Sequence, residues 1–379
     1  MRRVVKVSRI RIIITIIVVV LTTLLTGCTG KEPNEIAYVV ALGIDSTDDD
    51  NYKITIQYAN TTQISGGASE SGGKAGSEIV DNVTIEAPNI YAGVGLANNI
   101  VSKSFSMSHA KLIVFSKEIA EKGVKDMIET LVRSEEIRPD VFIAVANTTA
   151  NDYLTSVNPE MEVNPAQYYQ LIYQKNQLVG IPDGQLREFF TGLYTDNYDS
   201  ILPVAGVIEG AGGNSQNDDK GQSKDSQNEG SEGSSESLDS FESKNSDENE
   251  KEKDAEKNTS KYEYDIKNYV GGETAIEKKN KAEAIGAAVF EKDKMVGELG
   301  EVETEICKML KGDYTYSYLT YYNNDTPDIP ITVKTTQQKK PKYKIDTDKK
   351  TVDIELYIES DLYSLPADYN VENKIGDFE

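Results

Sequence analysis

The chain has 379 residues, of which 63 are acidic and 40 are basic, and its formal net charge is -23 at pH 7. Nucleic acids and anionic lipid surfaces attract lysine and arginine, so the excess of acidic residues excludes nucleic acids and anionic lipids as partners of the chain's own surface. Two cysteines and one histidine are too few for a cysteine- or histidine-rich metal site, and the length predicts two or three domains.

The N-terminus has the layout of a secretory signal peptide. The first eleven residues carry five positive charges and no acidic residue, and residues 12–25 are uncharged. This run is shorter than the ~20 apolar residues that span a bilayer. Leu25-Thr26-Gly27-Cys28 resembles the bacterial lipobox, in which the cysteine becomes an acylated N-terminus. We therefore expect signal cleavage after Gly27 and lipidation of Cys28 with fatty acids such as palmitate, the alternatives being a non-lipidated signal peptide or a short signal anchor.

Two acyl chains give stable membrane attachment, so the expected body is tethered and lies outside the membrane. After a short lipid-proximal tether at residues 28–33, residues 34–209 are predicted to form an α+β domain with helices packed on a sheet. It opens with strands at 35–45 and 52–59, joined as a hairpin by a polar turn.

Further elements of this domain follow from hydrophobic periodicity. A strand is predicted near residues 80–85, and a helix then begins at about Pro88. The buried face of that helix is expected to contain Ile90, Tyr91, Val94, Ala97, Ile100 and Val101. After a strand at 111–115, one helix over 117–133 is expected to bury Val124, Met127, Ile128, Leu131 and Val132. The next predicted elements are a strand at 141–146, helices at 151–156, from Pro165 with Asn164 as cap, and at 185–194, and a strand at 202–208.

Residues 210–268 differ sharply in composition from both neighbours. They are rich in acidic residues, serine, asparagine and glycine, and such a segment cannot bury enough apolar surface to offset the entropy of ordering it. The sequence therefore predicts a disordered acidic insert, which is a solvated linker or, alternatively, a docking or regulatory segment.

Residues 269–379 form the second predicted region. A hairpin is expected at 285–290 and 295–299, followed by a helix at 302–311. On that helix Cys307 shares an apolar face with Val302, Ile306 and Leu310, which predicts a small buried hydrophobe and not a nucleophile. Strands of an antiparallel sheet are predicted at 314–322, 329–335, 343–345 and 352–358. The basic cluster of Lys339, Lys340, Lys342 and Lys344 is expected to be a solvated hairpin edge.

Known catalytic and cofactor motifs find no match. A Ser-His-Asp triad would require His109, the one histidine, but neither Ser106 nor Ser108 lies in a Gly-x-Ser-x-Gly elbow, so a structural role is expected for His109. Gly73-Lys74 lacks the first glycine of a phosphate-binding loop, and Gly93-Val94-Gly95 lacks the third glycine of a dinucleotide fingerprint. The sequence thus predicts no enzyme, no cofactor and no metal site, and favours a binding or assembly role.

The order of several segments resembles the Ger(x)C family, the lipoprotein C subunits of spore germinant receptors in endospore-forming bacteria. The resemblance is carried by the lipobox and by Asn34–Ala37, Ala41–Asp45, Tyr52–Gln57, Ser108–Phe115, Arg138–Ala146, Asn151–Leu154, Ile201–Pro203, Ala287–Phe290 and Lys294–Gly297. The family's C-terminal domain usually continues well beyond the position of Ile358, so we expect this domain to be truncated or diverged.

The resemblance implies a non-catalytic subunit on the outer face of the spore inner membrane. Its implied partners are a multi-spanning A-type subunit and a transporter-like B-type subunit, with which it would act in the response to nutrient germinants. The alternative is a solute-binding lipoprotein that captures a small ligand by itself, although two unlike halves separated by an acidic insert argue against it. An exported hydrolase acting through His109 is a third hypothesis.

Overall fold

The structure is a computed structural model that describes residues 14–17, 35–49, 51–59, 80–159, 162, 164–174, 180–208, 268–274, 280–323 and 326–364. Gly27, Cys28, the expected tether at 28–33 and all but the last residue of the expected acidic insert lie outside these ranges.

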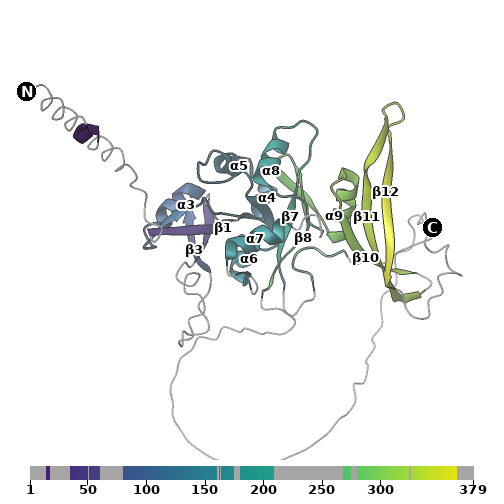
Figure 1. Ribbon diagram of the computed structural model, residues 1–379, viewed down its shortest axis with the longest axis horizontal. Helices are drawn as coiled ribbons and strands as arrows, with labels where there is room; N and C mark the ends of the chain where they lie inside the picture. The colour runs from purple at the N-terminus through teal and green to yellow at the C-terminus, as the bar shows by residue number, and fades with distance from the viewer. Residues whose placement is uncertain are drawn as a thin grey trace, which may run out of the picture.

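Nine strands of the described chain form one mixed sheet (Figure 1). Its central strands β1, β5, β6 and β7 are parallel, while β3-β2-β1 at one end and β7-β8-β9 at the other are antiparallel. The short β4 pairs in parallel with β1. The strands are β1 Ile36–Ser46, β2 Tyr52–Ala59, β3 Val80–Ala87, β4 Ser104–Ser106, β5 Leu112–Ser116, β6 Phe142–Ala146, β7 Ile201–Val207, β8 Ala282–Glu291 and β9 Lys294–Leu299.

Helices cover both faces of this larger sheet, and each face has its own hydrophobic core. One face carries α3 Ile90–Ala97, α4 Lys117–Lys122, α5 Lys125–Val132 and α8 Leu186–Leu193, and the other carries α6 Ala150–Ser156 and α7 Pro165–Gln174 (Figure 1). Because both faces are covered, β1, β5 and β6 are almost continuously buried and apolar and do not alternate. The expected α+β class with mixed and antiparallel sheets and packed helices is confirmed.

Polar contacts position the two helices of the second face. The Asp45 carboxylate accepts hydrogen bonds from the backbone N–H groups of Ala150 (2.6 Å) and Asn151 (3.0 Å) at the start of α6. The predicted Asn164 cap of α7 is confirmed, since its side chain accepts from the N–H of Ala166 at 3.0 Å. These bonds satisfy helix N–H groups that have no intrahelical partner.

Two helix predictions on the first face were wrong in their extent. The single helix expected over 117–133 is broken into α4 and α5 at Gly123, which has φ 122°, and the N–H of Val124 donates to the carbonyl of Asp293 in the β8–β9 turn. The helix expected from Pro88 begins at Ile90, with Asn89 as N-cap, and ends at Ala97. Three side chains expected in the core are exposed: Ile100 (65%), which lies beyond the end of α3, and Tyr91 (37%) and Val132 (39%), which lie within α3 and α5.

A second, smaller sheet follows in the order β10-β11-β12, with all its neighbours antiparallel. It consists of β10 Tyr316–Asn323, β11 Thr326–Asp346 and β12 Thr351–Ser364, preceded by α9 Glu301–Lys311. The strands predicted separately at 329–335 and 343–345 are one strand, whose register is irregular between Gln337 and Lys342. The four lysines of the basic cluster are exposed on β11.

Candidate functional site at the junction of the two sheets

Helix α9 lies at the junction, in contact with β8 and β9 of the larger sheet and with β11 of the smaller one. Its buried face is Thr304, Glu305, Lys308 and Met309. The prediction that Val302, Ile306, Cys307 and Leu310 form the buried face was wrong, because Ile306 is 48% exposed and Cys307 is partly exposed. Apolar periodicity alone did not indicate which side of the helix the two sheets would enclose.

Both ends of α9 are fixed by hydrogen bonds. The N–H of Gly300 donates to the Glu303 carboxylate at 2.9 Å, and the N–H of Val302 donates to the side-chain oxygen of Asn268 at 3.1 Å. At the other end Gly312 adopts the left-handed conformation (φ 76°) that commonly terminates helices. The helix is thus held in place on the larger sheet before the chain enters β10.

A buried polar network joins α9 to the smaller sheet. Ser317 Oγ donates to Glu305 Oε1 at 2.5 Å, and Gln337 Nε2 donates to the carbonyl of Met309 at 2.8 Å. The hydroxyls of Tyr314 and Thr335 are hydrogen bonded to each other beside them. The second carboxylate oxygen, Glu305 Oε2, is buried without a hydrogen-bond partner among the described residues.

This environment changes the ionisation of two side chains on α9. Burial raises the pKa of Glu305 to about 7, and the nearby Glu301 acts in the same direction, while the Ser317 hydrogen bond and Lys308 oppose the rise. Burial lowers the pKa of Lys308, against the attraction of Glu305 and Asp313. The junction therefore contains a carboxyl group that titrates close to neutral pH.

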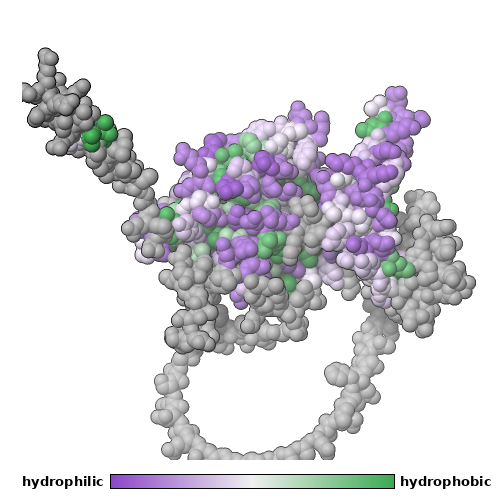
Figure 2. Space-filling view, viewed as in Figure 1, coloured by the Kyte–Doolittle hydropathy of each residue, from purple (hydrophilic) through white to green (hydrophobic). Residues whose placement is uncertain are grey.

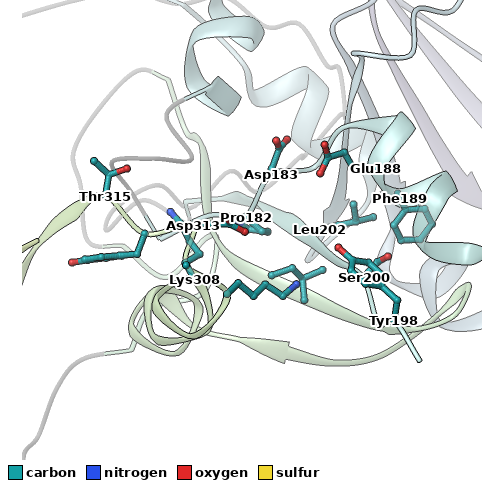
Figure 3. Close-up of a pocket in the computed structure, with 14 residues that line it drawn as sticks. Pro182, Asp183, Glu188, Phe189, Tyr198, Ser200, Leu202, Lys308, Asp313 and Thr315 are labelled. Carbon is teal, nitrogen blue, oxygen red and sulfur yellow. The ribbon is translucent and has the colours of Figure 1, made fainter. Parts of the chain in front are cut away.

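Beside this network lies a cavity of about 470 Å³ between the two sheets (Figure 3). Asp183 and Glu188 line it from the α8 side, whereas Lys308, Lys311 and Asp313 line it from α9 and the turn that follows. The Lys311 ammonium lies 5.6 Å from the centroid of the Tyr198 ring, a cation–π contact that spans the cavity. The protein atoms around Asp183 remove part of its hydration and, together with the smaller effect of the charge of Glu188, raise its pKa, although part of the side chain remains in contact with solvent.

The cavity can hold a small polar molecule or water, because charges of both signs line it. Asp183, Glu188 and Lys311 are exposed, and nothing in their arrangement pairs a nucleophile with a base. The sequence did not indicate this site, since its residues come from three separate segments and match no motif.

His109 lies outside the junction, in the segment that precedes the central strand β5 of the larger sheet. Its Nδ1 is 3.0 Å from Ser108 Oγ, which in turn is 2.9 Å from Ser106 Oγ, and its ring packs edge-on against Tyr38 at a centroid distance of 4.7 Å. No carboxylate of the described chain is hydrogen bonded to the imidazole. The geometry thus assembles a serine and a histidine but lacks the group that would orient a catalytic base.

Other sequence candidates also have ordinary packing roles. A Cβ atom added to Gly93 would lie 2.6 Å from Ile54 Cδ1, so this glycine allows α3 to approach β2 closely. Over the ranges that the structure covers, no group of three or more His, Cys, Asp or Glu side chains is placed to hold a metal ion. Nor does any helix in those ranges combine the length and the apolar character needed to cross a membrane.

Two family models match the chain, in order and without overlap. The model described as spore germination protein N-terminal domain matches residues 30–207, and the model described as spore germination B3/GerAC-like, C-terminal, matches residues 285–379. The boundary between them falls inside the larger sheet, because β8 belongs to the second match and pairs with β7 of the first.

Curated relatives carry related names. The chain is 26% identical to spore germination protein KC of Bacillus subtilis (strain 168), over 42% of each chain. It is 28% identical to the putative spore germination protein YfkR of the same organism, over 38% of this chain and 37% of the relative, and 26% identical to its spore germination protein B3, over 36% of each. The matched part is less than half of the length of each relative. No solved structure matches the chain.

Proposed function

The chain belongs to the GerAC family of spore germination proteins, and on this premise we propose that it is a lipid-anchored, non-catalytic subunit of a nutrient germinant receptor. The observation that carries the proposal is the ordered match of both halves of the chain to the two domains of that family. In this role it assembles with a multi-spanning A-type subunit and a transporter-like B-type subunit, and the signal for germination passes through the complex.

The lipobox at the N-terminus supports the proposed mode of attachment. Acylated Cys28 holds the body on the outer face of the spore inner membrane, and the acidic body itself contributes no attraction to anionic lipid. We further propose that residues 210–268 serve as a solvated connection between the N-terminal region at 34–209 and the C-terminal region at 269–379. Strands β8 and β9 return the chain to the larger sheet after this connection.

Replacing the lipidated cysteine tests the anchor. Cys28→Ala should move the protein from the membrane pellet to the soluble fraction and leave its circular dichroism spectrum unchanged, because the substitution removes the acyl chains without touching the described fold. Cys307→Ala is the matched control, since it removes the other cysteine, and it should leave the protein in the pellet. A Cys28→Ala protein that still pelleted with membranes would contradict lipid anchoring.

Assembly is tested by purification of the complex. The full chain, carrying an affinity tag and solubilised from spore membranes in detergent, should bring A-type and B-type subunits with it. Purification of the chain alone, under conditions in which a tagged A-type subunit retains its B-type partner, would contradict the proposal.

The cavity at the junction favours a second candidate function, capture of a small polar solute by the chain itself. Its volume of about 470 Å³ lies within the range of ligand sites, which is roughly 300–1,000 Å³. Calorimetric titration of the full chain with amino acids and sugars tests this function. A binding heat that disappears in Lys311→Glu but persists in Lys349→Glu, an exposed lysine on the far hairpin, would support solute capture.

A further inference from the structure

Helix α3 is apolar on all sides, although the described chain encloses only one side of it. The helix contains no charged residue, and the hydroxyl of Tyr91 is its one polar side-chain group. The side that contains Gly93 and Val94 is buried and packs against β2 and β3. On the opposite side Tyr91 is exposed and Leu96 is 47% exposed. A helix that is apolar all round is normally enclosed by protein or by lipid, so this exposed side calls for an apolar neighbour.

The turn after α3 extends this exposed side. Ile100 is 65% exposed, which is the largest exposed fraction of any large apolar side chain among the described residues between 35 and 208. The N–H of Phe105 donates to the side-chain oxygen of Asn98 at 2.8 Å, and this bond fixes the turn between α3 and β4. Figure 2 shows apolar residues among hydrophilic ones in the part of the molecule where α3 and α5 lie. Tyr91, Leu96 and Ile100 are called the α3 surface below.

The segment that carries the α3 surface contains no carboxylate. Residues 87–117 include neither Asp nor Glu, although 63 of the 379 residues of the chain are acidic. After the expected signal peptide, no other stretch of the sequence is as long without an acidic residue. Glu135 and Glu136 mark the border of the surface, because they line a groove together with Tyr91, whereas Leu96 and Ile100 are outside that groove. The acidic excess that opposes contact with anionic lipid is therefore absent from this segment.

The α3 surface lies beside the strand that follows the proposed lipid anchor. Strand β1 begins at Ile36, which pairs with Ser104 at the start of β4. Because the two strands are parallel, the turn that contains Ile100 enters β4 at the same end at which the chain enters β1 (Figure 1). Cys28 precedes Ile36 by eight residues, and eight extended residues span at most about 28 Å. In the anchored chain the start of β1 therefore stays within about 28 Å of the bilayer.

Lipid fits the α3 surface better than a second copy of the chain does. A stable protein interface takes about 20–30 residues on each side, and the α3 surface offers three exposed apolar side chains. A lipid contact needs fewer, since the acyl chains of the anchor already supply the affinity. The membrane is also the apolar phase that the anchor brings within reach of this end of the sheet.

We propose that the α3 surface is the face with which the body contacts the membrane. Leu96 and Ile100 insert into the boundary between headgroups and acyl chains, and Tyr91 lies at the level of the headgroups, where tyrosine is enriched. This inference rests on the proposed lipidation of Cys28. The acyl chains hold the protein at the bilayer, and the α3 surface gives the body one fixed orientation there.

The test measures how deeply a fluorescent label enters the bilayer. Ile100→Cys in a Cys307→Ala background gives one thiol for labelling, because Cys28 carries lipid in the proposed protein. The full lipidated chain is reconstituted into vesicles of phosphatidylcholine and phosphatidylglycerol, with or without a nitroxide on the acyl chains. Val296→Cys is the matched control, since Val296 is 60% exposed on β9, at the other end of the larger sheet. Its neighbour Met295 belongs to the same core as α3, so Val296 points to the opposite face.

Nitroxide lipids should lower the fluorescence of the label at position 100 by about twofold or more, because interfacial side chains enter the bilayer by roughly 5–10 Å. The label at position 296 should be unaffected. If the chain floats with the vesicles but both labels are quenched equally, or neither is quenched, the inference is wrong and the anchor stands. A chain that does not float with the vesicles would contradict the anchor at Cys28 and the inference with it.

Two further measurements separate lipid from other neighbours. Leu96→Glu places a carboxylate on the α3 surface, so it should abolish the quenching of the label at position 100. Leu171→Glu, at an exposed position of α7 on the other face of the sheet, should leave the quenching unchanged, and equal effects of the two substitutions would count against the proposal. A label at position 100 that is shielded from aqueous iodide but not quenched by nitroxide lipids would show that protein covers the α3 surface, and this result would overturn the proposal.

Discussion

The buried carboxyl of Glu305 should make the stability of the chain fall as the pH rises through neutrality. Its pKa is about 7 in the folded chain against an ordinary value of 4.5, so the folded state binds this proton more tightly than the unfolded state does. Stability contributed by a raised pKa is complete below the unfolded value and is lost as pH rises toward the folded value. The relevant window is therefore pH 4.5 to about 7.

The shift corresponds to about 3 kcal/mol over the whole window, of which about 2 kcal/mol falls between pH 5 and pH 8. Glu305→Gln removes the titration and leaves an oxygen that can accept the hydrogen bond from Ser317. The free energy of unfolding of the variant, minus that of the wild type, should therefore increase by about 2 kcal/mol from pH 5 to pH 8. Urea denaturation followed by circular dichroism measures this difference, in which titrating groups that do not interact with Glu305 cancel.

Glu303→Gln on the same helix is the matched control. The N–H of Gly300, followed by the side chain of Asn268, lowers the pKa of Glu303, so its contribution is present at neutral pH and is lost as pH falls. From pH 5 to pH 8 the difference for this variant should stay nearly constant, because the contribution of Glu303 is lost only as the pH falls below 4.5. Unfolding free energies of wild type and Glu305→Gln that stay parallel from pH 5 to pH 8 would refute the reasoning, because they would show that the carboxyl is not desolvated at the junction.

Two substitutions test the packing of the larger sheet. Gly123→Ala should lower the free energy of unfolding by about 1–3 kcal/mol, since Gly123 has φ 122° and an added Cβ would lie 2.7 Å from Asp293 Oδ2. The control is Gly95→Ala on α3, where an added Cβ would meet open space, and it should not lower the free energy of unfolding. Equal effects of the two substitutions would argue against a strained break between α4 and α5. Tyr169→Phe should cost about 1–3 kcal/mol, because the Tyr169 hydroxyl donates to the buried Gln57 amide oxygen at 2.5 Å and its loss leaves that oxygen without this donor. An unchanged urea midpoint for Tyr169→Phe would mean that water replaces the hydroxyl.

Local patterns were sufficient to locate most helices and strands of the described chain. The opening hairpin, the Asn164 cap of α7 and the β8–β9 hairpin depend on neighbouring residues, whose alternation, turn composition and capping chemistry are visible in the sequence. Prediction from local patterns failed where a contact with a residue distant in the sequence sets the end of a helix. The helix over 117–133 is interrupted at Gly123, and the N–H of Val124 there donates to Asp293 on a hairpin far along the chain.

The lipobox, the acidic composition and the family resemblance were likewise available from the sequence, because each depends on the identity and order of residues. The tertiary structure alone decided that β8 and β9 complete the sheet begun before residue 209, and that α9 turns Glu305 and Lys308 inward while Ile306 is exposed. Strand pairing and helix orientation are set by surfaces that are distant in sequence, and the burial of a charged group depends on everything packed around it. For this reason the titrating junction emerged only from the fold.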